Sequence, residues 1–377
     1  MKDQLKVAIV HDWLTGKRGG EKVLEVFCEL FPEAPVYTLL YNPGSISEKI
    51  ESHDIHSSFI DRLPFKKKWY RHYLPLFPTA VEQFNLKDYQ LLLSSSHCVA
   101  KGIIPGPNSL HISYLHTPMR YVWDMYHDYF GPGQVGRLSG KFIPFFANYL
   151  RNWDVSSSCR VDWFIANSQH VAKRIQKYYR REARVIHPPV DVSLFKMHPD
   201  HDNFDLIVSA LVPYKRVDLA VNAYNKLGKK LVIIGDGPEK KNLKKIAQAN
   251  IRFLDWQPHQ DLVQYYGRCR ALIFPGEEDF GIVPVEAMGC GKPVIAFARG
   301  GALETVIDEA HSANGKGTGI LFARQKPEDL IEAVIRSDSI SWDPYFIHQY
   351  AQKFDREKFK TQLHHFIEEK FNLFLNR

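Results

Sequence analysis

The stretch "ALIFPGEEDFGIVPVEAMGCGKPVIAF", residues 271–297, predicts a strand, a loop, a helix and a second strand in direct succession. The runs "ALIFP" (271–275) and "PVIAF" (293–297) are short and apolar without polar alternation, which is typical of strands buried on both faces. Between them, "FGIVPVEAMGCG" begins as a loop and continues as a helix. A strand–helix–strand unit of this kind predicts a parallel sheet with a right-handed crossover.

The same alternation extends outward over most of the chain. The stretch "HPPVDVSLFKMHPDHDNFD" (187–205) interrupts it and is rich in Pro, His and Asp. We therefore predict two doubly wound parallel-sheet α/β domains, residues 1–190 and 191–345, facing a cleft that receives the carboxyl ends of their strands. The C-terminal helical segment, 346–377, is expected to pack back on the first domain. The predicted strands are 6–11, 36–40, 90–95, 110–116, 163–167, 184–187, 205–211, 230–235, 251–255, 271–275, 293–297 and 319–322.

The composition is that of a globular protein, with 45% hydrophobic and 24% charged residues among 377. No run of 18 or more apolar residues occurs, so we expect no transmembrane helix. The N-terminus passes from "MKDQLK" directly into "VAIVH", so we also expect no signal peptide. The five cysteines are scattered and fit neither a metal site nor a disulfide framework, which indicates a reducing cytoplasm.

The net charge of +7 lies entirely in the first half of the chain. Residues 1–190 hold 24 Lys and Arg against 17 Asp and Glu, whereas residues 191–377 hold 25 of each kind. This asymmetry favours an acidic partner for the first domain. The densest basic stretch, "KKKWYRHY" (66–73), interleaves cations with aromatic rings, which suits an anionic membrane surface, single-stranded nucleic acid, or a solvated loop. Its candidate residues are Lys66, Lys67, Lys68, Trp69 and Arg71.

Two carboxylates flank the predicted helix start in the opening stretch. Glu278 lies in the loop after a buried strand, and Glu286 lies inside the helix. The first N–H groups of a helix have no partner within it, so they are available to a phosphate or a hydroxyl group. Carboxylates accept hydrogen bonds from pairs of hydroxyl groups. The pattern therefore predicts a hydroxyl-rich ligand, a sugar or a ribose.

Three further motifs follow predicted strands. Gly16, Gly19 and Gly20 form a glycine-rich turn that suits either a phosphate or an ordinary tight turn. His116 at a strand end is either a ligand contact or a structural histidine. Lys215 and Arg216 precede a helix and suit a diphosphate, or form a solvated basic pair.

Seven motifs in a fixed order are similar to family 4 of the retaining glycosyltransferases, and most closely to bacterial O-antigen and exopolysaccharide mannosyltransferases. The resemblance implies two Rossmann-like domains of the GT-B fold, the first binding an acceptor and the second a sugar nucleotide. The motifs are "RGGEKVLE" (18–25), "YLHTPMR" (114–120), "IANSQHVAKRI" (165–175), "HPPVDVSLF" (187–195), "LVPYKRVDLAV" (211–221), "VIIGDGPE" (232–239) and "FGIVPVEAMGCGKPVI" (280–295).

The resemblance also implies residue roles. Glu286 would bind the ribose, and His116 and Glu278 would act at the transferred sugar as the catalytic residues. The remaining donor-binding residues would hold the sugar or the diphosphate. The family usually has a glycine and an arginine where this chain has Ser209 and Ala210, and whether Arg216 replaces the missing arginine stays open. The remaining donor-binding set is Gly19, Gly20, Lys215, Arg216 and the backbone of Phe280, Gly281 and Ile282.

The expected function is therefore transfer of mannose from GDP-mannose to a polyprenyl-diphosphate-linked saccharide or a polysaccharide, without a metal ion or other cofactor. The expected place is the inner face of the cytoplasmic membrane, in peripheral contact with anionic lipid and without a nucleic-acid partner. Two alternatives stay open. One is a sugar-nucleotide epimerase of the same architecture, and the other is a non-catalytic protein that binds sugar or nucleic acid.

Overall fold

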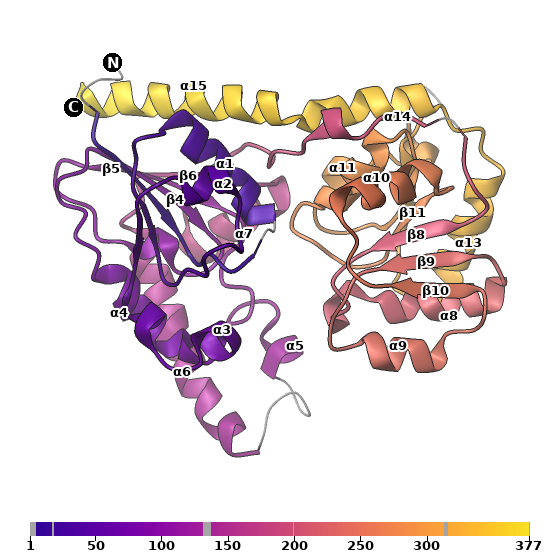
Figure 1. Cartoon of the computed structure of the whole chain (residues 1–377), viewed down its shortest axis with the longest axis horizontal. Helices are drawn as coiled ribbons and strands as arrows, with labels where there is room; N and C mark the ends of the chain where they lie inside the picture. The colour runs from indigo at the N-terminus through magenta and orange to yellow at the C-terminus, as the bar shows by residue number, and fades with distance from the viewer. Residues whose placement is uncertain (1–4, 17–18, 131–136, 199, 313–315, 377) are drawn as a thin grey trace. The chain divides into compact units, whose positions relative to one another are not determined.

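The β-strands form two parallel sheets, one in each of two compact units (Figure 1). The structure is a computed structural model, and it describes residues 5–16, 19–130, 137–198, 200–312 and 316–376. Residues 1–188 and 359–377 form unit 1, and residues 189–358 form unit 2. The predicted division after residue 190 thus differs from the observed one by two residues.

The sheet of unit 1 has seven strands in the order β3-β2-β1-β4-β5-β6-β7, and every neighbouring pair is parallel. Strands β4 and β5 are buried along their whole length, which explains why their sequences lack polar alternation. The strands are β1 Val7–His11, β2 Val36–Thr38, β3 Ile55–Ser57, β4 Leu91–Ser96, β5 Leu110–Leu115, β6 Trp163–Ala166 and β7 Ala183–Val185.

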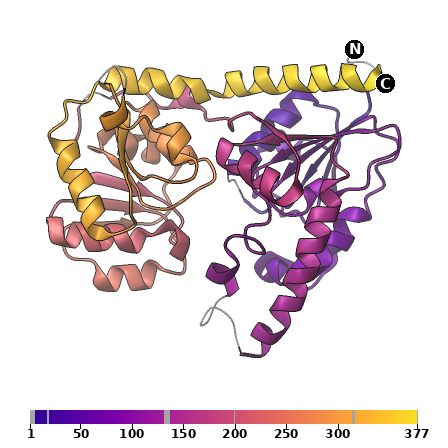
Figure 2. The ribbon, with the colours of Figure 1, turned by 180° about the vertical axis from the view of Figure 1, so that it is seen from behind.

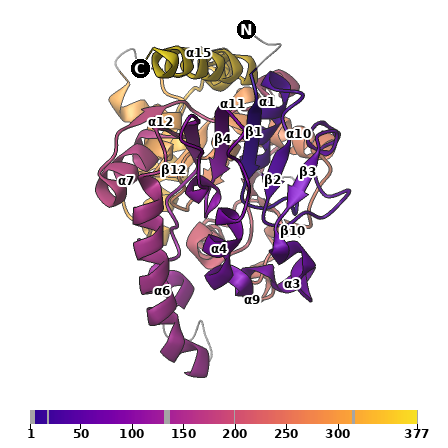
Figure 3. The same cartoon turned by 90° about the vertical axis from the view of Figure 1, so that its left-hand side faces the viewer.

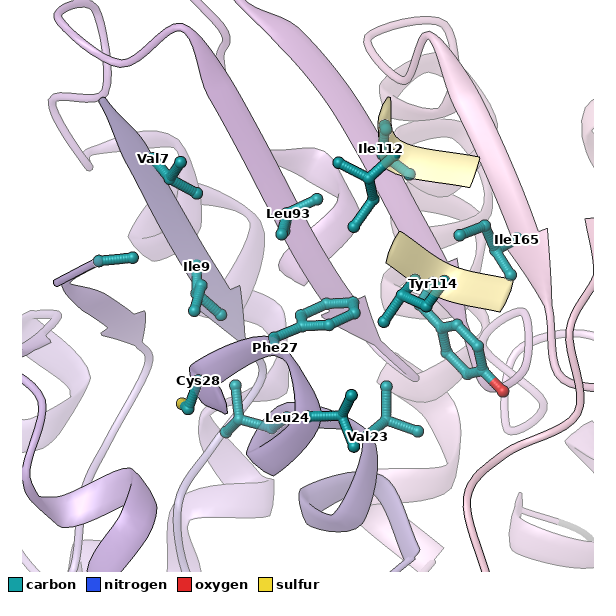
Figure 4. Packing of buried hydrophobic residues seen from close by; sticks show 14 of the residues in the cluster. Val7, Ile9, Val23, Leu24, Phe27, Cys28, Leu93, Ile112, Tyr114 and Ile165 are labelled. Carbon is teal, nitrogen blue, oxygen red and sulfur yellow. The ribbon is translucent and has the colours of Figure 1, made fainter. Parts of the chain in front are cut away.

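Helices cover both faces of this sheet. On one face, Val23, Leu24 and Phe27 of α1 pack against Ile9 and Leu93 (Figure 4). Alternate strand residues point to the other face, where they meet α4 and α6. The helices of unit 1 are α1 Gly19–Leu30, α2 Glu48–Glu51, α3 Lys66–Trp69, α4 Phe77–Glu82, α5 Tyr126–Phe130, α6 Arg137–Ser158 and α7 Gln169–Tyr179, with most of α15 Arg356–Leu375.

The sheet of unit 2 has six parallel strands in the order β10-β9-β8-β11-β12-β13. Its two faces also carry separate apolar clusters. The strands are β8 Asp205–Val208, β9 Leu231–Ile234, β10 Ile251–Leu254, β11 Leu272–Phe274, β12 Val294–Phe297 and β13 Gly319–Phe322. The helices are α8 Val217–Leu227, α9 Lys240–Ile246, α10 His259–Arg268, α11 Ile282–Gly289, α12 Ala302–Thr305, α13 Pro327–Asp338 and α14 Pro344–Ala351.

Each sheet has one point where the connections turn in opposite directions. In unit 1 it lies between β1 and β4, and in unit 2 between β8 and β11. The loops that leave two such strands diverge and leave a crevice at the carboxyl ends of the strands, where ligands of doubly wound sheets bind. The prediction of two doubly wound α/β domains is confirmed, and these two crevices locate the candidate site in each.

Strand β3 was not predicted from the sequence. It contains only Ile55, His56 and Ser57, and it lies at the edge of the sheet with a single neighbour, β2. An edge strand needs no continuous apolar run, because only part of its surface is buried. Hydrophobic periodicity therefore carries no signal for it.

The C-terminal segment divides between the two units, which corrects the prediction that residues 346–377 pack as a whole on the first domain. Ile347, Ala351 and Phe354 are buried in an apolar cluster of unit 2. Only from Phe359 onward does the chain belong to unit 1, where Leu363 and Phe371 join the cluster under α1. The reason is that α14 and α15 present apolar residues to different cores.

We predict that Leu363→Ala lowers the free energy of unfolding of unit 1 by about 2–5 kcal/mol, because the side chain is fully buried and its removal leaves a cavity. Leu373→Ala in the same helix is the matched control, since Leu373 is 48% exposed, and it should change stability by less than about 0.5 kcal/mol. Urea unfolding followed by circular dichroism measures both, and equal losses would contradict the assignment of α15 to this core.

Candidate active site

The crevice of unit 2 holds an ion pair between Lys215 and Glu278, the two residues that the sequence assigned to the diphosphate and the sugar. Lys215 ends the short helix Pro213–Lys215 that follows β8, and Glu278 lies in the loop that follows β11. Their side chains are 15% and 23% exposed, so both remain accessible. The structure therefore brings a cation and a carboxylate together where β8 and β11 diverge.

Glycines hold the loop that carries Glu278. A side chain at Gly276 would press on the backbone of Lys215, and side chains at Gly300 and Gly301 would overlap the backbone oxygens of Glu278 and Phe280. The N–H of Gly301 also donates to the carbonyl of Glu278 over 2.8 Å. Because backbone contacts backbone on two sides, the glycines determine the course of the loop.

Helix α11 begins directly after this loop. Gly281 precedes it with a φ of +88°, a backbone conformation that favours glycine, and the first helical residue is Ile282, within the stretch 280–291 where the sequence predicts a loop followed by a helix. The side chain of Phe280 is buried in the apolar cluster below, so only its backbone faces the loop. The N-terminus of α11 thus opens beside Glu278.

Glu286 lies in α11 and is partly exposed. The hydroxyl of Tyr266 donates to its Oε2 over 2.8 Å. Tyr266 is fully buried, and burial together with Glu286 raises the pKa of its hydroxyl, which therefore stays protonated as a donor. This tyrosine orients one carboxylate oxygen of Glu286, and it was not predicted from the sequence.

Arg216 is engaged away from the Lys215–Glu278 pair. Its guanidinium donates to Asp218 over 3.1 Å and 3.3 Å and to the side chain of Gln325 over 3.3 Å. Gln325 donates in turn to the carbonyl of Pro275, at the end of β11. Arg216 therefore braces the first turn of α8 and the loop after β11, which is a structural task.

In unit 1, the carboxylate of Asp12 organises the crevice. Its two oxygens accept from the backbone N–H groups of residues 97, 98, 99 and 100 over 2.6–2.9 Å. It also pairs with Nδ1 of His97 at 3.0 Å. Although burial opposes the charge, these partners hold the pKa of Asp12 well below its usual range. Asp12 therefore ties the loop after β4 to the end of β1 and fixes the ring of His97.

A hydrogen-bonded row crosses the ends of three neighbouring strands. The hydroxyl of Ser95 bonds Nδ1 of His11 at 3.1 Å and Nε2 of His116 at 2.8 Å. Burial lowers the pKa of His11 to about 4 and, together with the neighbouring His97 and His11 rings, lowers that of His116 to about 3. Both rings are neutral at pH 7, and the hydroxyl of Ser95 has one proton, so it can donate to no more than one of the two rings.

The glycine-rich turn meets this row. A side chain at Gly20 would lie 3.6 Å from both Cε1 of His11 and Nε2 of His116. Gly19 and Gly20 open α1, whose N-terminal N–H groups face the same crevice end of β1. The structure thus brings together three predicted residues, Gly19, Gly20 and His116.

The basic stretch 66–73 shows only part of the predicted arrangement of cations beside aromatic rings. Lys66 pairs with Asp61 at 2.6 Å and is only 26% exposed, so its charge is neutralised. Trp69 is 49% exposed, and its ring lies 5.2 Å from that of the exposed Phe65. The guanidinium of Arg71 stacks on Tyr70 at 5.6 Å. The side chains of Lys67 and Lys68 lie outside the described residues.

The sequence missed His11, Asp12, Ser95, His97 and Tyr266. Four of these share one signal, because they stand at or just after the predicted strands 6–11 and 90–95. Strand ends point to the crevice, so the pairs "HD" (11–12) and "SSSH" (94–97) would have been found by reading every strand end together.

Comparison with protein families identifies both halves of the chain. The family described as "Glycosyltransferase Family 4" matches residues 18–194, and the family described as "Glycosyl transferases group 1" matches residues 195–338. The two matches follow one another without a gap and meet close to the division between the units.

Known proteins give the same result for parts of the chain. An uncharacterized glycosyltransferase of Methanocaldococcus jannaschii is 31% identical over 179 residues, 46% of this chain and 49% of that protein. The D-inositol 3-phosphate glycosyltransferase of Mycobacteroides abscessus is 27% identical over 200 residues, 46% of this chain and 43% of that protein. The chain thus spans about half the length of the curated relatives that it matches.

Solved structures share the fold over nearly the whole chain. The complex of Anabaena Alr3699/HepE with UDP and glucose has a TM-score of 0.68 at 17% identity and covers 97% of this chain and 100% of that one. Sucrose-phosphate synthase from Thermosynechococcus elongatus has a TM-score of 0.70 at 18% identity, covering 98% and 100%. Two Rossmann-like parallel-sheet domains of this kind define the GT-B fold. With both family matches, residues 18–338 carry two consecutive glycosyltransferase domains.

We predict that unit 1 loses stability as the pH falls from about 6.5 to about 4. In this range the unfolded state protonates His11 while the folded state, whose pKa for His11 is about 4, does not. His11→Asn keeps a partner for Ser95 and removes this titration, so the stability of the variant should depend less on pH. Urea unfolding of parent and variant at pH 7 and at pH 5 gives the free energy of unfolding that each loses between the two pH values. An equal loss in both proteins would contradict the prediction.

Proposed function

We propose that the chain is a retaining glycosyltransferase that moves a sugar from a sugar nucleotide to an acceptor. The observation that carries this proposal is the Lys215–Glu278 pair at the β8/β11 crevice, beside the N-terminus of α11 and Glu286. A cation and helix N–H groups suit a diphosphate, and two carboxylates suit the hydroxyl groups of a ribose and a sugar. The two matches to glycosyltransferase families support the same reaction.

The residues take the following roles in this proposal. Lys215 and the backbone of residues 280–282 hold the diphosphate and sugar. Glu286, oriented by Tyr266, accepts from the ribose hydroxyl groups. For Gly19, Gly20 and the neutral His116, the family resemblance implies roles toward the diphosphate and the transferred sugar. Arg216, engaged with Asp218 and Gln325, is not assigned to the donor.

The chemistry rests on charge stabilisation. The bond between the sugar and the diphosphate breaks through an oxocarbenium-like state, and Lys215 with the helix N–H groups stabilises the leaving phosphate. The acceptor oxygen forms its bond on the same face, and its proton passes to the leaving phosphate. Glu278 is paired with Lys215, which suits a carboxylate that positions the sugar better than one that attacks it.

The donor in this proposal is GDP-mannose, on the resemblance to O-antigen and exopolysaccharide mannosyltransferases. Structures of the same fold carry other nucleotides: UDP with glucose in Alr3699/HepE, and ADP in starch synthase IV of Arabidopsis thaliana. A panel of GDP-, UDP- and ADP-sugars, each followed by product analysis, therefore tests the base and the sugar. Conversion of the donor sugar to its epimer without an acceptor would instead show an epimerase.

The acceptor in this proposal is a saccharide on polyprenyl diphosphate, reached by peripheral contact with an anionic membrane. The excess positive charge of residues 1–190 supports this contact. None of the helices among the described residues combines the length and the apolar character that crossing a membrane requires. Phe65 and Trp69 are exposed beside Arg71 and supply an aromatic and basic edge.

We predict that Lys215→Ala and Glu286→Ala each weaken binding of the best donor by about 1.5–3 kcal/mol, because each removes a hydrogen bond to a charged group. Isothermal titration calorimetry measures the affinity, and circular dichroism checks the fold. Glu286→Gln keeps an acceptor for Tyr266 and separates loss of charge from loss of packing.

The matched control is the exposed ion pair of Lys226 and Glu328 in the same unit, whose side chains are 59% and 64% exposed. Lys226→Ala and Glu328→Ala should leave donor affinity unchanged. The site assignment fails if the Lys215 and Glu286 variants bind the donor as tightly as these controls do.

We also predict that the activity persists in excess EDTA, because Lys215 and the N-terminus of α11 supply the positive charge that a metal ion supplies elsewhere. Across the described ranges, no group of three or more His, Cys, Asp or Glu side chains is arranged to hold a metal ion. Product formation with and without EDTA is the measurement. Complete loss that Mg²⁺ or Mn²⁺ restores would refute metal independence.

A further inference from the structure

The N-terminal part of α6 exposes a concentration of aromatic residues. Phe142 is 60% exposed, Phe145 76%, Phe146 46% and Tyr149 43%. Their spacing places them on one stripe of the helix, and Pro144 between them is exposed as well. Apolar surface of this extent on one helix is unusual for a side that only water contacts.

The other end of the same helix is firmly anchored. Ala147, Leu150 and Trp153 are buried in a core cluster of unit 1. Asp154 accepts from the indole of Trp123 and from the hydroxyl of Tyr179, each over 2.8 Å. The helix therefore leaves the body of unit 1 as a supported arm, which the magenta ribbon shows in three views (Figure 1, Figure 2 and Figure 3).

The sequence around this arm carries only positive charge. No Asp or Glu occurs between Asp128 and Asp154, whereas Arg137 and Lys141 precede the aromatic residues in that interval. Arg151, which follows them, donates to the carbonyl of Val122 and is not counted with these cations. Lys141 is exposed one residue before Phe142. Aromatic side chains next to cations, without acids, match the interface of a membrane that contains anionic lipid, where rings enter the acyl boundary and cations meet headgroups.

We propose that residues 141–149 of α6, named here the α6 arm, insert into the surface of an anionic bilayer and are the main membrane contact of the protein. The proposal deepens the proposed function, since it rests on an acceptor that is carried on a lipid. It places the main membrane contact on α6 and not on the basic stretch 66–73, named here the Lys66 stretch. The Lys66 stretch is a weaker candidate because Asp61 neutralises Lys66 and because Tyr70 and Phe77 are buried in the core.

The full chain is tested by sedimentation with vesicles of phosphatidylcholine, with and without phosphatidylglycerol. The variant with Phe142→Ala, Phe145→Ala and Phe146→Ala should lose at least about tenfold in affinity for the anionic vesicles, since three exposed rings no longer become buried. The matched control is Leu373→Ala with Leu375→Ala, which removes exposed leucines from α15. The control should bind the vesicles as the parent does. Added salt should weaken vesicle binding by the parent and by the control.

A label on the arm tests direct insertion. Phe145→Cys in a Cys159→Ser background leaves an exposed thiol at the arm, because the other cysteines, Cys28, Cys98, Cys269 and Cys290, are buried. An environment-sensitive dye on this thiol should shift to the blue with anionic vesicles only. Donor affinity of each variant, measured without vesicles, separates failure of the arm from failure of the proposed function.

Three outcomes overturn the proposal. The aromatic variant binds vesicles as well as the parent; or Lys66→Glu with Lys67→Glu and Lys68→Glu abolishes binding while the aromatic variant retains it; or the parent ignores vesicles and forms a dimer that the aromatic variant cannot form. In the last outcome a second copy of the chain, and not lipid, covers the arm. Loss of binding in the aromatic variant with normal donor affinity supports the proposal.

Discussion

A single buried carboxylate connects most of the functional parts of unit 1. Asp12 accepts from four consecutive N–H groups and from His97, and so it holds the loop after β4 against the end of β1. The next residue of that loop, Lys101, is fully buried and pairs with Asp154 of α6 at 3.0 Å. A buried charge without a partner costs several kcal/mol. The buried Asp12 therefore requires its N–H partners and His97, and the buried Lys101 requires Asp154. The crevice and the base of the α6 arm are thereby positioned together.

Among the described residues of unit 2, no fully buried carboxylate lies in the crevice between β8 and β11. Its loops contact one another through backbone atoms. Gly235 and Gly237 on the loop after β9 contact the loop after β8, and Gly276, Gly300 and Gly301 make such contacts around Glu278. The charged side chains of Lys215 and Glu278 extend from loops whose backbone is held by these contacts. The Lys215–Glu278 pair consequently lies on the surface of the crevice and can exchange partners, whereas the Asp12 contacts cannot be exchanged without unfolding the loop.

The sequence predicted every strand of both sheets except β3, because parallel strands buried on both faces leave continuous apolar runs. It also predicted the helix between β11 and β12 and the strand-end positions of His116, Lys215 and Glu278. It could not predict the sheet order, which makes His11, Ser95 and His116 neighbours although they are far apart in the chain. It also could not predict the ion-pair partners that determine which charged side chains are left to bind a ligand. Asp61 neutralises Lys66, and Asp218 binds Arg216. Both contacts depend on the direction of the side chains, which hydrophobic periodicity does not predict.

The glycine contacts around Glu278 have a consequence for how this chain can diverge or be redesigned. A methyl group at position 276, 300 or 301 would overlap backbone, which cannot yield as a side chain can. Random mutagenesis of the loop should therefore tolerate almost nothing at these three positions. Variation is confined to positions that already carry a side chain, such as 277–279. The chain thus separates the residues that shape the loop from those that can change its selectivity, and a focused library can alter one group while keeping the other constant.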